Sequence, residues 1–173
     1  SVYTLYLWWL IMTDIIIRAM TASDIEVVWA INQENIPAVG EETVEVLADL
    51  LSMSLFSLVA EADNVVVGFC MVLGPQTQYQ SPNYLYFCER YDDFIYLDRV
   101  AVTGAFQGLG LGAALYSEVE KQSNSTLFAL EVNTKPRNEG SLRFHTREGF
   151  VMLEEVETRP GKMVGFMIKE LKG

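Results

Sequence analysis

The feature that most constrains the fold of this chain is the stretch from Val100 to Gly112, VAVTGAFQGLGLG, which precedes a helix-like run at residues 113–120. An apolar strand here enters a glycine-rich turn, and the turn opens a helix whose first backbone amides have no partner within the helix. Glycine lets a ligand approach the backbone closely, and a helix N-terminus favours negative charge. The sequence therefore predicts a ligand that carries phosphate groups.

The size and composition of the chain indicate a single globular domain. Half of the 173 residues are hydrophobic and one-fifth are charged. Cys70 and Cys88 lack the spacing of a metal or redox site, so free thiols in a reducing cytoplasm and no bound metal are expected. Residues 1–12 are interpreted as an apolar extension, either upstream of a true start near Met12 or packing against a neighbour. The domain itself is expected at residues 13–173.

The negative charge of the chain is unevenly distributed. Residues 1–93 carry 13 acidic and 2 basic side chains, whereas residues 94–173 carry 10 of each. The neutral half, which contains the glycine turn, would tolerate a phosphate ligand, although the acidity of the other half could equally serve solubility. Nucleic acid is not expected as a partner because no basic face is available. The apolar segment at residues 3–12 is too short to span a membrane, so no membrane partner is expected either.

Hydrophobic periodicity predicts elements in the order β-α-α-β-β-β-α-β-α-β-β, a mixed α/β layer architecture. A hairpin-type turn is expected at Asp63–Asn64. Residues 74–93 are expected to form a long irregular loop. The expected strands are 15–18, 57–62, 65–73, 94–102, 127–132, 151–158 and 162–169, and the expected helices are 25–33, 43–53, 110–122 and 138–147.

Taken alone, the glycine turn has a competing interpretation as a dinucleotide-binding fingerprint. Gly108–Ala113 fits that pattern, and Glu131 lies near the expected ribose-binding position. Two features count against it. Residues 103–107 separate the strand from the first glycine, and the preceding strands are typical of an antiparallel meander.

A second interpretation starts one residue earlier. Gln107-Gly-Leu-Gly110-Leu-Gly112 resembles the acetyl-CoA signature Gln/Arg-x-x-Gly-x-Gly/Ala of the GCN5-related N-acetyltransferase (GNAT) superfamily. Asn138–Phe150, NEGSLRFHTREGF, is similar to that family's helix Asn-x-x-Ala/Ser-x-x-Phe-Tyr-x-x-x-Gly-Phe. Residues 91–102 and 131–133 further resemble a little-characterised bacterial subgroup of predicted acetyltransferases. The resemblance implies a mostly antiparallel central sheet that splays between strands 4 and 5 and is flanked by helices.

The resemblance also implies the cofactor site. Acetyl-CoA would be the acyl donor, and the acetyl group would pass directly to a small amine or peptide amine in a ternary complex. The pyrophosphate would meet the backbone of Gln107, Gly108, Leu109, Gly110, Leu111 and Gly112. The pantetheine arm would lie along Val100, Ala101 and Val102. Further contacts are expected from Asn133, Asn138, Ser141, Phe144, His145 and Arg147, with Lys135, Arg137 and Arg143 as other candidates for the 3′-phosphate. Both asparagines could instead serve as turn and cap residues.

His145 is the catalytic candidate that departs from the family pattern, which usually has Tyr at this position. The resemblance implies that it would protonate the departing thiolate, and imidazole is a suitable acid near neutral pH. A structural role for this histidine is the alternative.

The resemblance implies that an acidic residue on the central strand, or water, takes a proton from the acceptor amine. Tyr96 and Asp98 alternate onto one face of that strand, and Asp98 is the preferred base, with a surface ion pair to Arg99 as the alternative. Acidic residues of the long loop are expected to attract an amine-bearing acceptor, namely Glu89, Asp92 and Asp93.

Two further hypotheses stay open at this point. One is a non-catalytic acyl-CoA-binding or regulatory module of the same fold, and the remote one is a dinucleotide-dependent oxidoreductase. Homodimers are common in the resembled family, and the sequence does not identify the acceptor.

Overall fold

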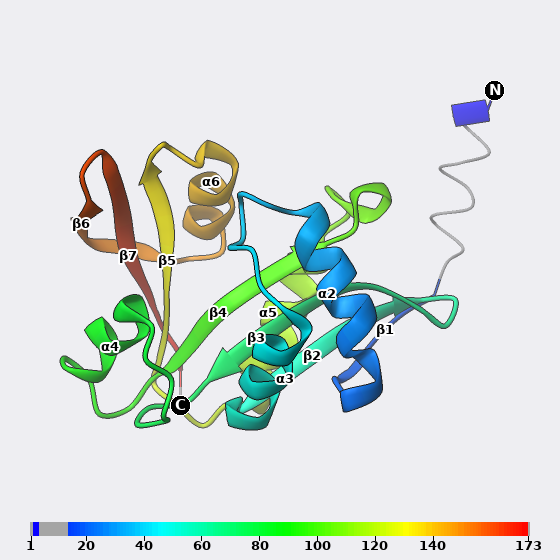
Figure 1. The fold of residues 1–173 in the computed structure, drawn as a ribbon, viewed down its shortest axis with the longest axis horizontal. Helices are drawn as coiled ribbons and strands as arrows, with labels where there is room; N and C mark the ends of the chain where they lie inside the picture. The colour runs from blue at the N-terminus through cyan, green and yellow to red at the C-terminus, as the bar shows by residue number, and fades with distance from the viewer. Residues whose placement is uncertain (1, 4–13, 173) are drawn as a thin grey trace.

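The computed structural model describes residues 2–3 and 14–172, so the extension expected at residues 1–12 lies almost wholly outside the described residues. A seven-stranded sheet of order β1-β2-β3-β4-β5-β7-β6 runs through them (Figure 1). All neighbouring strands are antiparallel except β4 and β5, which confirms the mixed α/β fold. The strands are β1 (Ile15–Ala19), β2 (Phe56–Ala62), β3 (Val65–Leu73), β4 (Ile95–Val102), β5 (Leu127–Lys135), β6 (Val151–Arg159) and β7 (Lys162–Glu170).

Helices cover both faces of this sheet (Figure 1). One face packs on α2 (Ile25–Glu34), α3 (Val44–Met53) and α4 (Pro82–Cys88), and the other on α5 (Leu111–Gln122) and α6 (Glu139–Arg147). Successive residues of β3 alternate between the two cores, as a strand requires: Phe69 and Met71 join the first and Cys70 and Val72 the second. Short 3₁₀ turns lie at Ala22–Asp24 and Gly104–Phe106. No helix within the described residues has the length and apolar character needed to cross a membrane.

The loop expected at residues 74–93 was wrong in its middle, where α4 forms. Pro82 occupies the first turn of this helix, a position where its missing N–H is of no consequence. Tyr84 and Phe87, three residues apart, are both fully buried against the sheet. This helical spacing of aromatic residues could have predicted α4, but the helix has only 7 residues, too few for the spacing to repeat.

The parting of β4 from β5 is the feature that positions the site. The two strands pair only at Ile95–Phe128 and Tyr96–Ala129, near their beginnings. Beyond these pairs β5 turns away and carries β7 and β6 with it (Figure 1). The expected splay between strands 4 and 5 is therefore confirmed, and the arrangement is not the parallel βαβ sheet that a dinucleotide-binding fold requires.

At the β1 edge of the sheet, Arg18 forms ion pairs with two carboxylates, those of Asp24 and Glu61. Its guanidinium donates to both carboxylate oxygens of Asp24 at 2.8 and 2.9 Å and to Glu61 Oε1 at 2.9 Å. The Asp24 carboxylate also accepts the backbone N–H of Thr21. Hydrogen bonding by Arg18 lowers the pKa of Asp24 to about 2.

Acid should therefore destabilise the fold through Asp24. Because its pKa is lower in the folded chain than the ordinary value of 3.8, its contribution is present above about pH 4 and is lost as the pH falls toward 2. We expect about 2 kcal/mol at most from this group. Urea unfolding at pH 2.5 and pH 5 should show a smaller pH dependence in Asp24→Asn than in the wild type. Asp63→Asn, at the exposed β2–β3 turn, is the control for loss of a carboxylate, and equal pH dependence in Asp24→Asn and the wild type would contradict the assignment.

Candidate functional site

A cavity of about 610 Å³, here named the turn cavity, lies beside the glycine turn. It combines the end of β4, the start of α5 and one side of α6. Most of the residues predicted to bind a cofactor line it: Val100, Ala101, Val102, Gln107, Gly108, Gly110, Leu111, Gly112, Asn138, Ser141, Phe144, His145 and Arg147. Two predicted residues do not line it: Leu109, whose side chain is half exposed, and Asn133, which lines a neighbouring cavity.

The backbone of the turn is shaped for a ligand. Gly108 and Gly110 have φ values of 76° and 82°, and a Cβ at either position would meet nothing within 4 Å. Glycine is therefore needed here for its conformation and leaves open space at the cavity wall. The side chain of Gln107 donates to the carbonyl of Val102 at 3.0 Å and holds the turn against the end of β4. Since α5 begins at Leu111, its unpaired first amides lie at this wall.

A second cavity of about 780 Å³, here named the sheet cavity, lies over the other side of the parted strands. Its walls come from the loop between α2 and α3, from α4, and from β5, β6 and β7. Its lining includes Asn83, Tyr86, Glu131, Val156, Arg159, Lys162, Val164 and Phe166.

The two cavities meet at a shared wall. The residues that line both are Ala38, Val39, Asp98, Arg99, Glu131, Asn138 and Ser141. Two carboxylates, Asp98 and Glu131, thus lie where a ligand in one cavity would approach a ligand in the other. A site with two ligand chambers and titratable groups between them is suited to transfer of a group from one ligand to the other.

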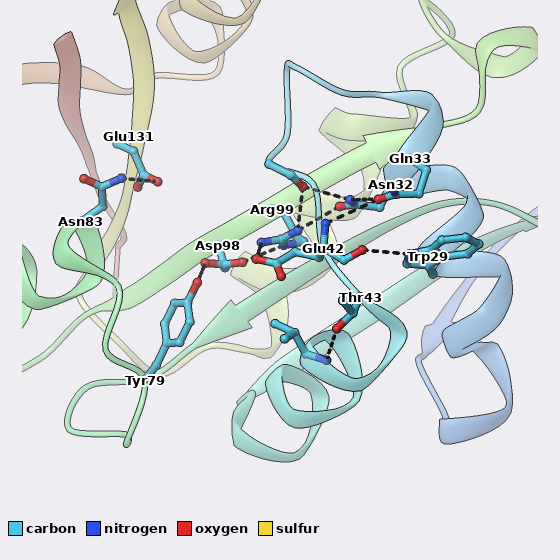
Figure 2. A network of polar contacts seen from close by, with 12 residues as sticks. Trp29, Asn32, Gln33, Glu42, Thr43, Tyr79, Asn83, Asp98, Arg99 and Glu131 are labelled. Carbon is cyan, nitrogen blue, oxygen red and sulfur yellow. Dashed lines mark hydrogen bonds and ion pairs between the residues drawn. The ribbon is translucent and has the colours of Figure 1, made fainter. Parts of the chain in front are cut away.

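Asp98 belongs to a buried polar network (Figure 2). Its carboxylate accepts from Tyr79 Oη at 2.6 Å and from Arg99 Nε at 2.7 Å. The side chains of Asp98 and Arg99 are 5% and 7% exposed, so the predicted ion pair exists but is buried rather than on the surface. Arg99 also donates to Asn32 at 2.9 Å and to the carbonyl of Gly40 at 3.4 Å. The pair therefore holds the loop between α2 and α3 over both cavities.

Glu131 has a different environment, formed by neutral donors. Tyr96 Oη donates to Oε2 at 2.7 Å, and Asn83 Nδ2 donates to Oε1 at 3.1 Å. Burial raises the pKa of Glu131 to about 7, and the negative charge of Asp98 acts in the same direction. The two hydrogen bonds oppose this shift only partly. A carboxylate with a pKa near 7 can accept a proton and release it again at neutral pH.

His145 lies in the wall of the turn cavity with both ring nitrogens engaged. Nδ1 lies 2.8 Å from the carbonyl oxygen of Ser141, which can only accept, so Nδ1 carries the proton. Nε2 then accepts the hydroxyl of Tyr116 at 2.8 Å. The ring is 4% exposed, and burial lowers its pKa. The Ser141 hydroxyl, 3.2 Å from Nδ1, lies on the shared wall.

The other predicted residues fall into distinct places. Tyr96 lines neither cavity, but its hydroxyl reaches Glu131. Asn138 caps α6, where its Oδ1 accepts the N–H of Ser141 at 3.2 Å. The acidic loop residues Glu89, Asp92 and Asp93 line neither cavity, and neither do Lys135, Arg137 and Arg143.

Glu131 is the site residue that sequence reasoning missed as a catalytic candidate. It interrupts the apolar run Leu127–Val132, and a carboxylate within a buried strand is rare unless it is functional or paired. That signal was available. Its bond to Asn83 was not, because Asn83 belongs to the helix that the sequence did not predict.

Comparison with known proteins agrees with this geometry. The model of the acetyltransferase (GNAT) family matches residues 20–150. The chain belongs to this family. N-acetyltransferase is therefore its general enzyme class, and comparison with curated proteins finds no match.

Solved structures share the fold of this acetyltransferase at low identity. Ard1 from Thermoplasma volcanium has a TM-score of 0.73 at 22% identity, over 92% of this chain and 99% of that one. The ribosomal-protein-alanine N-acetyltransferase from Brucella melitensis has 0.70 at 24%, over 90% and 99%. The protein yncA from Salmonella typhimurium, solved with its cofactor acetyl-CoA, has 0.69 at 18%, over 92% and 95%.

Replacing a turn glycine tests the role of the turn cavity. Gly110→Ala places a Cβ on a residue with positive φ, which should lower the free energy of unfolding by about 1 kcal/mol and shift the turn. CoA binding, measured by calorimetry, should weaken. Gly104→Ala is the matched control, because it lies in the same loop with open space and without a positive φ. Equal CoA affinity in the two variants would contradict a ligand role for the turn.

Proposed function

We propose that this chain transfers the acetyl group of acetyl-CoA to a primary amine, with donor and acceptor bound at the same time. The single observation that supports this most is the wall shared by the two cavities, where Glu131 lies. The turn cavity is suited to the donor and the sheet cavity to the acceptor. We further propose that residues 13–173 form one acetyltransferase domain.

The turn cavity fits the chemistry of coenzyme A. Its open glycines and the start of α5 offer backbone N–H groups to a pyrophosphate. The edge of β4 at Val100–Val102 that β5 leaves unpaired offers main-chain groups to the amide-containing pantetheine arm, while the Val102 carbonyl is held by Gln107 and Asn35. Arg147, in the same wall, is available for a phosphate. Acetyl-CoA supplies an activated acetyl thioester, and the chain must bind it, orient it and manage the protons.

We assign Glu131, rather than Asp98, as the general base. Both carboxylate oxygens of Asp98 are already engaged, one by Tyr79 Oη and the other by the guanidinium of Arg99. Glu131 meets only neutral donors and has a pKa near 7, so it can take a proton from the acceptor ammonium. The freed amine nitrogen then forms a bond to the acetyl carbon as the carbon–sulfur bond breaks. Placing the two reactants together supplies much of the rate.

Ser141 is assigned to the departing thiolate, with His145 as its positioning residue. Because Nδ1–H of His145 points to the backbone and hydroxyl of Ser141, the Ser141 hydroxyl proton is free to face the cavity. It would donate a hydrogen bond to the sulfur as negative charge develops there. The nitrogen loses its second proton through water to the thiolate, which leaves as the neutral thiol, and the proton held by Glu131 returns to solvent.

The pH dependence of turnover tests the base. Since Glu131 must be deprotonated, kcat/KM for the amine should rise with pH up to about 7 and fall roughly tenfold per unit below it. Glu131→Gln should lower kcat by about 100-fold or more and remove this limb. Tyr96→Phe removes a hydrogen bond that favours the charged form of Glu131, so the rising part of the pH profile should move to higher pH. Glu155→Gln, on exposed β6, is the control. A limb that survives in Glu131→Gln would contradict the assignment.

Substitution at Ser141 and His145 tests leaving-group stabilisation. Ser141→Ala should lower kcat by about 10- to 100-fold while acetyl-CoA affinity changes little. His145→Ala should also lower kcat, and His145→Asn should restore part of it because its amide N–H can replace Nδ1–H. The double variant Ser141→Ala/His145→Ala should be hardly worse than Ser141→Ala alone, since both act on one group. Additive losses of kcat in the double variant would refute the coupling between Ser141 and His145. If the chain bound acetyl-CoA but released no thiol with any amine, it would instead be a non-catalytic binding module.

A further inference from the structure

The floor of the sheet cavity is a defined strip of side chains. Glu131 of β5 lies opposite Phe166 of β7, and Val164 lies opposite Val156 of β6. Residues directly opposite one another, and alternate residues along a strand, share a face of the sheet. Lys162, two and four positions before Val164 and Phe166, therefore belongs to the same strip, and it lines the cavity.

The strip changes character along its length. At its inner end is Glu131, on the wall shared with the turn cavity. Its middle is apolar, where the ring of Phe166 stacks on Tyr86 with centroids 3.7 Å apart and Val156 and Val164 follow. Its outer end, at the turn between β6 and β7, carries Arg159 and Lys162. Lys162 and Phe166 are four positions apart along β7, which is about 13 Å of strand.

The two cations at the outer end lack acidic partners among the described residues. Neither forms an ion pair with any of them. Nearby Glu154 is engaged by Tyr86 and by Arg90, and Glu157 accepts the N–H of Gly161 in the turn. In a chain of net charge −11, two unpaired cations at the rim of a cavity form a local region of positive potential that attracts anions.

We propose that the acceptor carries, besides its amine, an anionic group about 13 Å away that Arg159 and Lys162 bind. This inference rests on the proposed function of the sheet cavity. The amine would lie at Glu131, an apolar spacer along Val156, Val164 and Phe166, and a carboxylate or phosphate at the β6–β7 turn. An extended peptide spans this distance in about four residues, and a long ω-amino acid spans it with methylene groups. A polyamine is disfavoured because its second cation would meet Arg159 and Lys162.

Matched acceptors test this directly. The peptides Ala-Val-Ala-Glu-amide and Ala-Val-Ala-Gln-amide differ only in one charge, and 11-aminoundecanoate and 11-amino-1-undecanol form the corresponding small-molecule pair. Thiol release from acetyl-CoA gives kcat/KM for each. In at least one pair, we expect kcat/KM to be about tenfold or more higher for the anionic member. The pair that shows this preference indicates whether the acceptor is a peptide or a small amino acid. The preference should weaken with added salt.

Two double variants of equal charge change separate the site from the overall field. Arg159→Gln/Lys162→Gln should reduce the preference for the anionic acceptor to about one. Lys121→Gln/Lys172→Gln, whose residues line neither cavity, should keep it. Equal rates for charged and neutral acceptors in the wild type, or a preference that persists in Arg159→Gln/Lys162→Gln, would overturn the inference while leaving acetyl transfer intact. Failure of every amine to release thiol would instead overturn the proposed function. Calorimetric titration of the Glu peptide into the wild type and Arg159→Gln/Lys162→Gln would then decide the anion site alone, with equal affinities overturning it.

Discussion

The parting of one parallel strand pair is the constraint on which the rest of this structure depends. Because β4 pairs with β5 only at Ile95 and Tyr96, the later residues of the two strands do not pair with each other. The turn cavity opens on one side of this gap and the sheet cavity on the other. Neighbouring elements complete these walls: the glycine turn leads into α5, α6 places Ser141, and the hairpin of β6 and β7 extends the floor. A continuous sheet would have left no shared wall.

On that wall, the carboxylates of Asp98 and Glu131 have different hydrogen-bond partners and therefore different roles. Asp98 is bonded to a buried guanidinium, so it contributes structure by fixing the loop between α2 and α3. Glu131 is bonded to a phenol and an amide, neither of which neutralises its charge, and burial then brings its pKa near 7. Residue type and position on a strand are similar for the two. Their partners, which come from distant parts of the chain, make the difference.

The sequence predicted the scaffold of the site better than its chemistry. The order of strands and helices and the conformation of the glycine turn follow from local patterns, because glycine conformation and strand alternation are local properties. The splay and the other residues of the turn cavity were predicted from the resemblance to the GNAT family. The environment of Glu131 and the hydroxyl that His145 Nε2 accepts depend on contacts between residues 29 to 48 positions apart, namely Tyr116 with His145, Tyr96 with Glu131 and Asn83 with Glu131. No spacing rule encodes such pairs. Asp98 as the preferred base was the natural inference from one strand considered alone.

The loop between α2 and α3 has a thermodynamic consequence. Ala38 and Val39 line both cavities, and Arg99 ties the same loop to the sheet through the carbonyl of Gly40. A ligand that shifts this loop from one side therefore reshapes the chamber on the other side. Linkage then requires reciprocity: whatever factor the first ligand contributes to the affinity of the second, the second returns to the first. In the proposed ternary complex, the strength of this coupling would thus depend on a few loop residues that take no part in the proposed proton transfer.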